Sequence, residues 1–269
     1  MSDQDASAEQ HPLAQRITTP LAWQDLVLDA RVRDEIEMIA RWVRHSNTLL
    51  ETWGLARRLK PGYRSLFCGP PGTGKTLAAC LLGKAAGLAV YRIDLSRVLS
   101  GWIGETEKNL AALFDHAAAH DWILFFDEAD ALSGKRTESR SANDRAHNQQ
   151  VAYLLQRIED YPGIVILETT LRSHMDEAFI RRFQSVIHFP MPDAEQRLRL
   201  WRDMFSDAGF ALAADVDFER LAADHELTGG GIVNVLRHAA LLAAERKPPV
   251  VRADDLRQAV QREIRKEEP

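Results

Sequence analysis

Two short segments of the 269-residue chain combine residue types and spacings that could act on phosphate groups. The first, GPPGTGKT at residues 69–76, satisfies G-x-x-x-x-G-K-[ST] and lies between an apolar run and a helix-forming run. Glycines let backbone N–H groups turn toward phosphate oxygens, and the start of a helix adds its positive dipole end. We therefore expect Lys75 to contact the β- and γ-phosphates of a nucleotide and the Thr76 hydroxyl to bind Mg²⁺. The residues expected to bind the nucleotide are Pro71, Gly72, Thr73, Gly74, Lys75, Thr76 and Leu77.

The second segment is ILFFDEAD, residues 123–130. Its four apolar residues suit a buried parallel strand, so Asp127 and Glu128 would stand at the carboxyl end, where such sheets bind ligands. We expect Asp127 to bind Mg²⁺ and Glu128 to orient the attacking water as a general base. Two acids after a strand can also form a solvated turn or a helix cap, but the preceding phosphate loop favours hydrolysis.

The elements that must position these residues alternate between short apolar runs and amphipathic helical runs. Such alternation predicts an α/β fold, a parallel sheet with helices on both faces. A helical segment at residues 29–53 precedes it. The expected strands are 65–68, 89–95, 122–127, 163–170 and 185–189. The expected helices between them are 75–87, 105–120, 147–161 and 176–183.

The periodicity changes after residue 193, because residues 194–266 contain only helical patterns. The first fifteen or so residues lack periodic apolar content, which is typical of disorder. We therefore predict three parts: a disordered tail at 1–16, a large nucleotide-binding domain at 17–192, and a small helical lid domain at 193–269.

Composition limits the classes of partner. The net charge of −5 does not indicate a surface that binds nucleic acid, and no apolar run has the length of a membrane span. The polar, acidic first residues are unlike a signal peptide, so we expect a cytoplasmic protein with neither nucleic acid nor membrane as a partner. Cys68 and Cys80 fall in apolar runs, where buried thiols are expected instead of a disulfide or a metal site.

With these motifs the chain resembles the AAA+ ATPases, from about residue 22 to its last helix. The resemblance implies a P-loop NTPase fold, that is, a parallel-sheet sandwich with a C-terminal helical lid, between which ATP and Mg²⁺ bind. It also implies that the chain assembles with itself into a ring, usually a hexamer, that acts on polypeptide substrates.

The segment SGWIGETEKN, residues 100–109, places two large apolar side chains between glycines. In the family, a loop at this position carries an aromatic residue, a hydrophobic residue and a glycine, and lines the central pore. The resemblance therefore implies that Trp102 and Ile103 grip polypeptide by apolar contact. The alternative is that Trp102 anchors the loop on its own domain.

The segment ETTLRSHMDEAFIRRF resembles the family region that ends in arginines acting on a neighbouring subunit. Thr170 matches the sensor position, where the family typically has asparagine, and could donate a hydrogen bond to the γ-phosphate or the water. Arg181 and Arg182 match the arginine fingers, although paired arginines at a helix end can also complement its dipole. Many members carry another arginine after the phenylalanine, where this chain has Gln184.

In the expected lid, LTGGGIVNVLRHAA resembles the second sensor, and Gly230 and Gly231 would approach the nucleotide through their backbone. Some branches carry an arginine where this chain has Val233, so an arginine from the lid is not expected. Residues 26–28 resemble the stretch whose backbone holds adenine. Residues 133–147 would form a second pore loop, or a solvated connection.

The favoured interpretation is an ATP-hydrolysing ring that remodels, assembles or threads proteins. Within the family, three segments look most like the small single-ring ATPases of phage-tail-like contractile injection systems: LFFDEADALSGKR, VAYLLQRIEDYPG and DEAFIRRFQSVIHFPMPDAEQRLRLW. That likeness would imply particle proteins as substrates. Two alternatives are a nucleic-acid motor or loader, which the acidic charge and aromatic loop disfavour, and a nucleotide-dependent scaffold that does not hydrolyse ATP.

Overall fold

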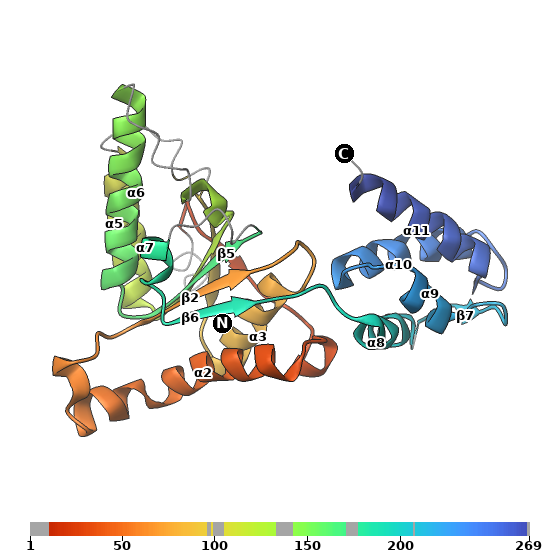
Figure 1. Ribbon diagram of the computed structural model, residues 1–269, viewed down its shortest axis with the longest axis horizontal. Coiled ribbons are helices and arrows are strands. Elements are labelled where there is room, and N and C mark those ends of the chain that lie inside the picture. Colours follow the sequence, from red (N-terminus) through yellow and green to blue (C-terminus); the bar gives the residue numbers. More distant parts are fainter. Residues whose placement is uncertain are drawn as a thin grey trace, which may run out of the picture. The chain divides into compact units, whose positions relative to one another are not determined.

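The computed structural model describes residues 11–95, 98, 105–132, 142–170, 177–206 and 208–267. These residues include a six-stranded sheet (Figure 1), whose strand order is β1-β3-β4-β5-β2-β6. Strands β2 to β6 pair in parallel, which confirms the predicted parallel sheet. The strands are β1 (Gln15–Ile17), β2 (Tyr63–Cys68), β3 (Val90–Asp94), β4 (Ile123–Asp127), β5 (Ile164–Thr169) and β6 (Ser185–His188).

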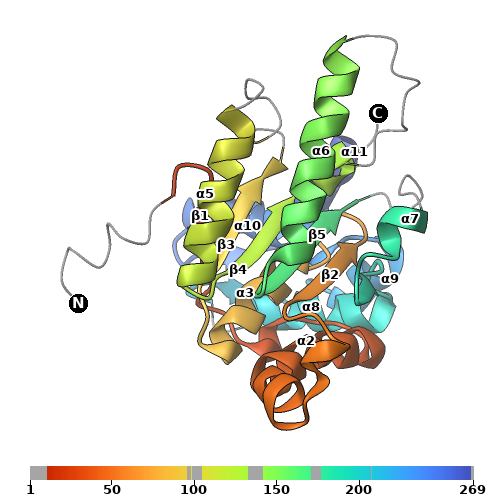
Figure 2. The same ribbon diagram turned by 90° about the vertical axis from the view of Figure 1, so that its left-hand side faces the viewer.

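Helices cover both faces of this sheet (Figure 2). Helices α5 and α6 lie side by side on one face, where their apolar side chains meet those of the strands. Helix α3 packs on the opposite face so closely that a Cβ on Gly83 would lie 2.2 Å from the Val90 side chain. The helices of this part are α2 (Ala30–Asn47), α3 (Lys75–Ala86), α5 (Glu105–Ala119), α6 (Ala142–Asp160) and α7 (Glu177–Ile180).

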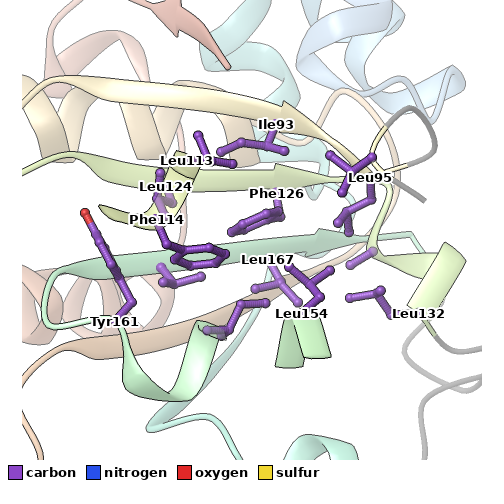
Figure 3. Packing of buried hydrophobic residues seen from close by; sticks show 14 of the residues in the cluster. Ile93, Leu95, Leu113, Phe114, Leu124, Phe126, Leu132, Leu154, Tyr161 and Leu167 are labelled. Atoms are coloured by element: carbon purple, nitrogen blue, oxygen red, sulfur yellow. The ribbon is translucent and has the colours of Figure 1, made fainter. Parts of the chain in front are cut away.

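The central strands form because their sequences are apolar nearly throughout, as burial on both faces requires. In β4, all four residues Ile123–Phe126 are fully buried. Leu124 and Phe126 point toward α5 and α6, together with Leu167 of β5, and Figure 3 shows these side chains packed with Phe114. Because side chains alternate along a strand, Asp127 points to the other face, where α3 lies.

A buried tyrosine, Tyr161, lies at one end of this core, on the left in Figure 3. The Tyr161 hydroxyl donates to the backbone oxygen of Trp122 at 2.6 Å, and the backbone oxygen of Ala117 lies 3.2 Å from it as an alternative acceptor. Burial raises the pKa of Tyr161, and the hydroxyl remains protonated as a donor. This contact joins the end of α6 to the start of β4.

Three features differ from the sequence expectations or fall outside the description. Gln15 and Arg16, which we expected in a disordered tail, lie in β1, an antiparallel edge strand paired with β3. Residues 142–147, expected in a loop, belong to α6, whose helix begins at Ala142. Trp102 and Ile103 lie outside the described residues.

The described residues fall into two compact units. The first comprises those within Met1–Ala22, Ala30–Gly69 and Lys75–His188, and the second those within Trp23–Asp29, Pro70–Gly74 and Phe189–Pro269. The domain boundaries expected after residues 16 and 192 stay a prediction. Across the described ranges, no helix combines the length and the apolar character needed to cross a membrane.

The second unit is built mainly from helices around a core that includes Trp201, Val235 and Leu256. Its helices are α8 (Ala194–Phe205), α9 (Phe218–Asp224), α10 (Gly229–Ala244) and α11 (Ala253–Glu267). The expectation of helices alone was wrong in one detail, because β7 (Ala211–Leu212) and β8 (Val250–Val251) form a parallel pair. Strands of two residues are too short to show alternation in a sequence.

Candidate functional site

Polar side chains gather in the first unit where β4 and β5 end and α3 begins. The parallel register pairs Phe126 with Leu167, so the next residues, Asp127 and Glu168, stand side by side at the carboxyl edge. Phe126 and Leu167 face the core under α5 and α6, and alternation therefore turns Asp127 and Glu168 toward α3. The observed strand order, in which β5 lies between β4 and β2, thus brings the second motif to the helix that follows the first.

Lys75, the first residue of α3, is buried with 2% of its side chain exposed. Its ammonium donates to the backbone oxygen of Gly69 at 2.7 Å. It also lies 3.2 Å from Glu168 Oε1. Burial of a lysine is costly unless the charge is paired, and these two oxygens provide the compensation.

Glu168 connects both phosphate-loop side chains to the sheet. The Thr76 hydroxyl donates to Glu168 Oε2 at 3.4 Å. Burial raises the pKa of Glu168, the charge of Lys75 opposes this rise, and the charge of Asp127 adds to it. Lys75, Thr76 and Asp127 therefore all influence one carboxylate, and their common role in nucleotide binding stays a prediction.

Sequence reasoning missed Glu168. The signal was present, because the run IVILET ends in a polar pair at the carboxyl end of an expected parallel strand. The same rule, that ligands bind at the carboxyl ends of parallel strands, indicates Asp127 and Glu128. Glu168 itself belongs to no family motif.

Asp127 is held by an arginine that sequence reasoning also missed. Its carboxylate forms an ion pair with Arg92 of β3. The Asp127 Oδ1 atom also accepts the backbone N–H of Glu128 at 2.9 Å. Arg92 and Asp127 come from adjacent parallel strands, a proximity that depends on strand order and not on spacing along the chain.

Glu128 has an unusual backbone conformation, with φ at +57°. A residue with a Cβ adopts the left-handed region at a cost of about 1–2 kcal/mol, and such strain clusters at functional sites. The Glu128 side chain is exposed to solvent immediately after the buried strand. This geometry is compatible with the predicted role of a base that meets water.

Thr170, the predicted sensor, is engaged with the acidic motif. Its hydroxyl donates to Asp130 Oδ2 at 3.1 Å, and its backbone N–H donates to the same atom at 3.3 Å. The neighbouring Thr169 hydroxyl donates to Asp130 Oδ1. A hydroxyl has one hydrogen, so a bond from Thr170 to phosphate or water requires exchange of the Asp130 contact.

The two predicted finger arginines differ in their surroundings. Arg182 forms an ion pair with Glu159 near the end of α6. Arg181 is 80% exposed, and its ion pair is with Glu177 one helical turn earlier, at 3.5 Å. Exposed pairs of this kind stabilise little, so Arg181 is the arginine with more freedom to change partners.

Gln184 explains one departure from the family pattern. Its side-chain oxygen accepts the backbone N–H of Arg64 at 2.7 Å, and its own N–H donates to the Arg64 oxygen at 2.9 Å. The two residues extend the pairing of β6 with β2 by one position before the Ser65–Ser185 pair. Gln184 therefore has a structural role that arginine at this position could not provide.

In the second unit, the phosphate-loop segment 70–74 contacts the start of α10. The Gly230 N–H donates to the Gly72 oxygen at 3.0 Å, and the Gly231 N–H donates to the Thr228 hydroxyl at 3.1 Å. A Cβ on Gly230 would lie 2.9 Å from the Gly72 Cα. The two amides that we expected to face the nucleotide thus have protein partners, and a nucleotide role for them stays a prediction.

The other loop residues are placed as follows. The Thr73 hydroxyl donates to the Pro70 oxygen at 2.8 Å. Leu26, expected near adenine, is buried, and a Cβ on Gly74 would lie 2.6 Å from its side chain. Pro71 is exposed, and Leu77 lies half-buried in α3.

The donor set fits Mg²⁺ bound together with a phosphate ligand. No cluster of three or more His, Cys, Asp or Glu side chains in the described ranges could hold a metal ion. Mg²⁺ does not need such a cluster, because it keeps waters and takes one or two carboxylates plus substrate phosphates. Asp127 and the Thr76 hydroxyl are oxygen donors of this kind.

Comparison with known proteins places the site in a family context. Residues 65–191 match the model of the ATPase family associated with various cellular activities (AAA). The chain is 39% identical over 138 residues to the uncharacterized AAA family ATPase y4kL of Sinorhizobium fredii, covering 51% of this chain and 41% of the relative.

Two further relatives match over more of the chain. The proteasome-activating nucleotidase of Methanopyrus kandleri is 29% identical over 249 residues, 90% of this chain and 56% of the relative. The ATP-dependent zinc metalloprotease FtsH 3 of Symbiobacterium thermophilum is 31% identical over 239 residues, 86% of this chain and 37% of the relative. The matches therefore span about half or less of these relatives' own length.

Proposed function

Because residues 65–191 form an AAA-type ATPase domain with a P-loop fold, we propose that the chain is a Mg²⁺-dependent ATPase that acts on proteins. One observation carries the proposal: Lys75 and Thr76 meet the carboxyl edge of the sheet at Glu168, beside Asp127. Two motifs about fifty residues apart in the sequence thus converge, as nucleotide hydrolysis requires.

The phosphate loop binds the triphosphate in this proposal. Backbone N–H groups of residues 72–77 surround the phosphate oxygens, and Lys75 contacts the β- and γ-phosphates. Thr76 and Asp127 would hold Mg²⁺, which neutralises charge that develops on the phosphates.

Glu128 orients the attacking water and accepts its proton. The water oxygen bonds to the γ-phosphorus while the bond to the bridging oxygen breaks, which yields ADP and phosphate. Thr170 stabilises the water or the γ-phosphate by a hydrogen bond. Arg181, with Arg182 beside it, stabilises the transferred phosphoryl group from the next subunit.

We propose a ring of identical subunits, a hexamer, with Trp102 and Ile103 on polypeptide-gripping loops. Protein substrates are supported by the names of two relatives, one a proteasome-activating nucleotidase and the other an ATP-dependent metalloprotease. Work on protein particles in the cytoplasm, in assembly of a contractile injection system, is the narrower form of this proposal. Its support is the sequence likeness of the acidic motif and of the segment around residues 151–163.

Substitution of Glu128 by glutamine tests the proposal. We expect Glu128→Gln to reduce phosphate release by about 10²-fold or more and to leave ATP binding within about threefold, because the amide keeps the shape but loses the base. A matched control is Glu37→Gln, which removes an exposed carboxylate on α2. Turnover that persists in Glu128→Gln would remove Glu128 from the mechanism, and absence of turnover in the assembled wild type would favour a scaffold.

A further inference from the structure

We propose that Glu168 is a positioning residue that competes with the phosphates of ATP for Lys75 and Thr76 and thereby limits the affinity for nucleotide. This inference rests on the proposed function and adds a control of affinity within the same site. It concerns a carboxylate that the nucleotide-binding pattern itself does not include.

Glu168 contacts both phosphate-loop side chains. Glu168 presents one oxygen to the Lys75 ammonium, at 3.2 Å, and the other to the Thr76 hydroxyl, at 3.4 Å. These are the two side-chain groups of the phosphate loop that we assign to the β- and γ-phosphates and to Mg²⁺. A phosphate oxygen that takes the same donors must share them with Glu168 or displace it.

The negative charge of Glu168 opposes the binding of phosphate groups. Glu168 has 14% of its side chain exposed, so water screens its charge little. A carboxylate that touches both phosphate-binding side chains lies close to the bound phosphates, and like charges at that separation repel. When a phosphate recruits Lys75, Glu168 also loses the cation that offsets its burial.

Regular secondary structure fixes the backbone of Glu168 and of its partners. Glu168 is held on the sheet by β5, which pairs with β2 up to Cys68 and Thr169. Lys75 and Thr76 are held at the start of α3. Since both sides are parts of regular elements, the carboxylate cannot leave the site without a change of its own rotamer. The competition is therefore built into the fold of the first unit.

The consequence is weaker binding of any nucleotide with a β-phosphate. ATP and ADP should both bind less tightly than a site with a neutral residue at position 168 would allow, and ADP should leave faster after hydrolysis. AMP, which lacks the phosphates that Lys75 contacts, should bind with an affinity independent of Glu168.

Isothermal titration calorimetry of the full chain with ATP, ADP and AMP tests this inference. For Glu168→Gln and Glu168→Ala, we expect the dissociation constants of ATP and ADP to fall about tenfold, a change typical of removing one nearby like charge. The constant for AMP should stay within about twofold. Glu37→Gln serves as the control, since it removes one partly exposed carboxylate of the same unit whose ion pair is with Arg44.

The outcomes separate the two proposals. If the wild type binds ATP but Glu168→Gln binds it equally or more weakly, the Glu168 inference fails and the ATPase proposal stands. An equal gain for AMP would also overturn it, because a general structural change would then explain the effect. If the wild type does not bind ATP, both proposals fall.

A destabilised variant still gives an answer, because loss of Glu168 leaves Lys75 buried without its carboxylate. The measurement is then the rise in Tm that saturating ATP produces. We expect a larger rise in Glu168→Gln and Glu168→Ala than in the wild type, since tighter binding stabilises the folded state more. An equal or smaller rise in both variants would overturn the inference.

Discussion

Charged residues at the carboxyl edge of the sheet form two pairs of opposite charge. Glu168 faces Lys75, and Arg92 faces Asp127. The first pair is buried, where removal of one partner leaves an uncompensated charge and costs several kcal/mol. The second pair is partly exposed and should contribute little to stability. Its main effect should be to compete with Mg²⁺ for the Asp127 carboxylate.

Arg92→Gln should lower the Mg²⁺ concentration that ATP hydrolysis requires. The Arg92 guanidinium forms an ion pair with the Asp127 carboxylate, which we assign to Mg²⁺. Removal of the guanidinium leaves Asp127 more available to the cation. We expect the half-saturating Mg²⁺ concentration to fall about three- to tenfold, measured by phosphate release and by ATP binding. Arg31→Gln, which removes an exposed arginine paired with Glu35, is the control. An unchanged or higher Mg²⁺ requirement would contradict the assignment.

Among the elements, α10 has a first turn shaped by its neighbour. Thr228 caps the helix through the Gly231 N–H, and the following glycines let the backbone approach the loop segment 70–74. The approach is closest at Gly230, whose Cβ would meet the Gly72 backbone, while a Cβ on Gly229 would stay 3.5 Å from the Gly72 oxygen. Close packing of two backbones is therefore the local reason for Gly230.

Gly230→Ala and Gly229→Ala form a matched pair that tests this packing. Gly230→Ala should lower the free energy of unfolding by about 1–3 kcal/mol, the usual cost of forcing atoms into a filled space. Gly229→Ala should be neutral or stabilise by up to about 1 kcal/mol, because alanine is the better helix former. Urea denaturation of both variants measures the difference. Equal effects would mean that the loop yields to the added methyl group.

For the whole molecule, the exposed position of Arg181 suits action on a neighbouring subunit. Arg182 is tied to Glu159 of α6, whereas the partner of Arg181 is one turn away on an exposed surface. A site completed from a second copy makes hydrolysis depend on assembly. The activity of a mixture of variants can then exceed that of its components.

Mixing Arg181→Ala chains with Lys75→Ala chains tests this dependence. Each variant alone should lose at least about 10²-fold in turnover, because one lacks the arginine and the other the phosphate-binding lysine. In mixed rings, a Lys75→Ala subunit supplies Arg181 to an intact site on its neighbour, so activity should return in part. Phosphate release at several mixing ratios measures the recovery. A mixture that stays inactive, although the chains co-assemble, would show that Arg181 does not act in trans.

The sequence predicted the elements of the sheet unit well because their signals are local. Short apolar runs such as ILFF, bounded by polar residues, favour buried strands, and the strands begin and end within about two residues of the expected positions. The sequence did not predict the edge strand β1, because Gln15 and Arg16 are polar. They form a strand because the backbone of β3 has an edge with which they can pair. The two-residue strands of the second unit depend on tertiary contacts in the same way.

By itself, the sequence determined the α/β class, the phosphate loop and the acids at the end of β4, since these follow from residue type, spacing and strand polarity. Only the tertiary structure decided the partners: Glu168 on Lys75, Arg92 on Asp127, Asp130 on Thr170, and Gly72 on Gly230. Each pair joins residues far apart along the chain, or neighbours in a strand order that the sequence does not state. Electrostatic and packing energies depend on distance in space, and that distance exists only once the chain has folded.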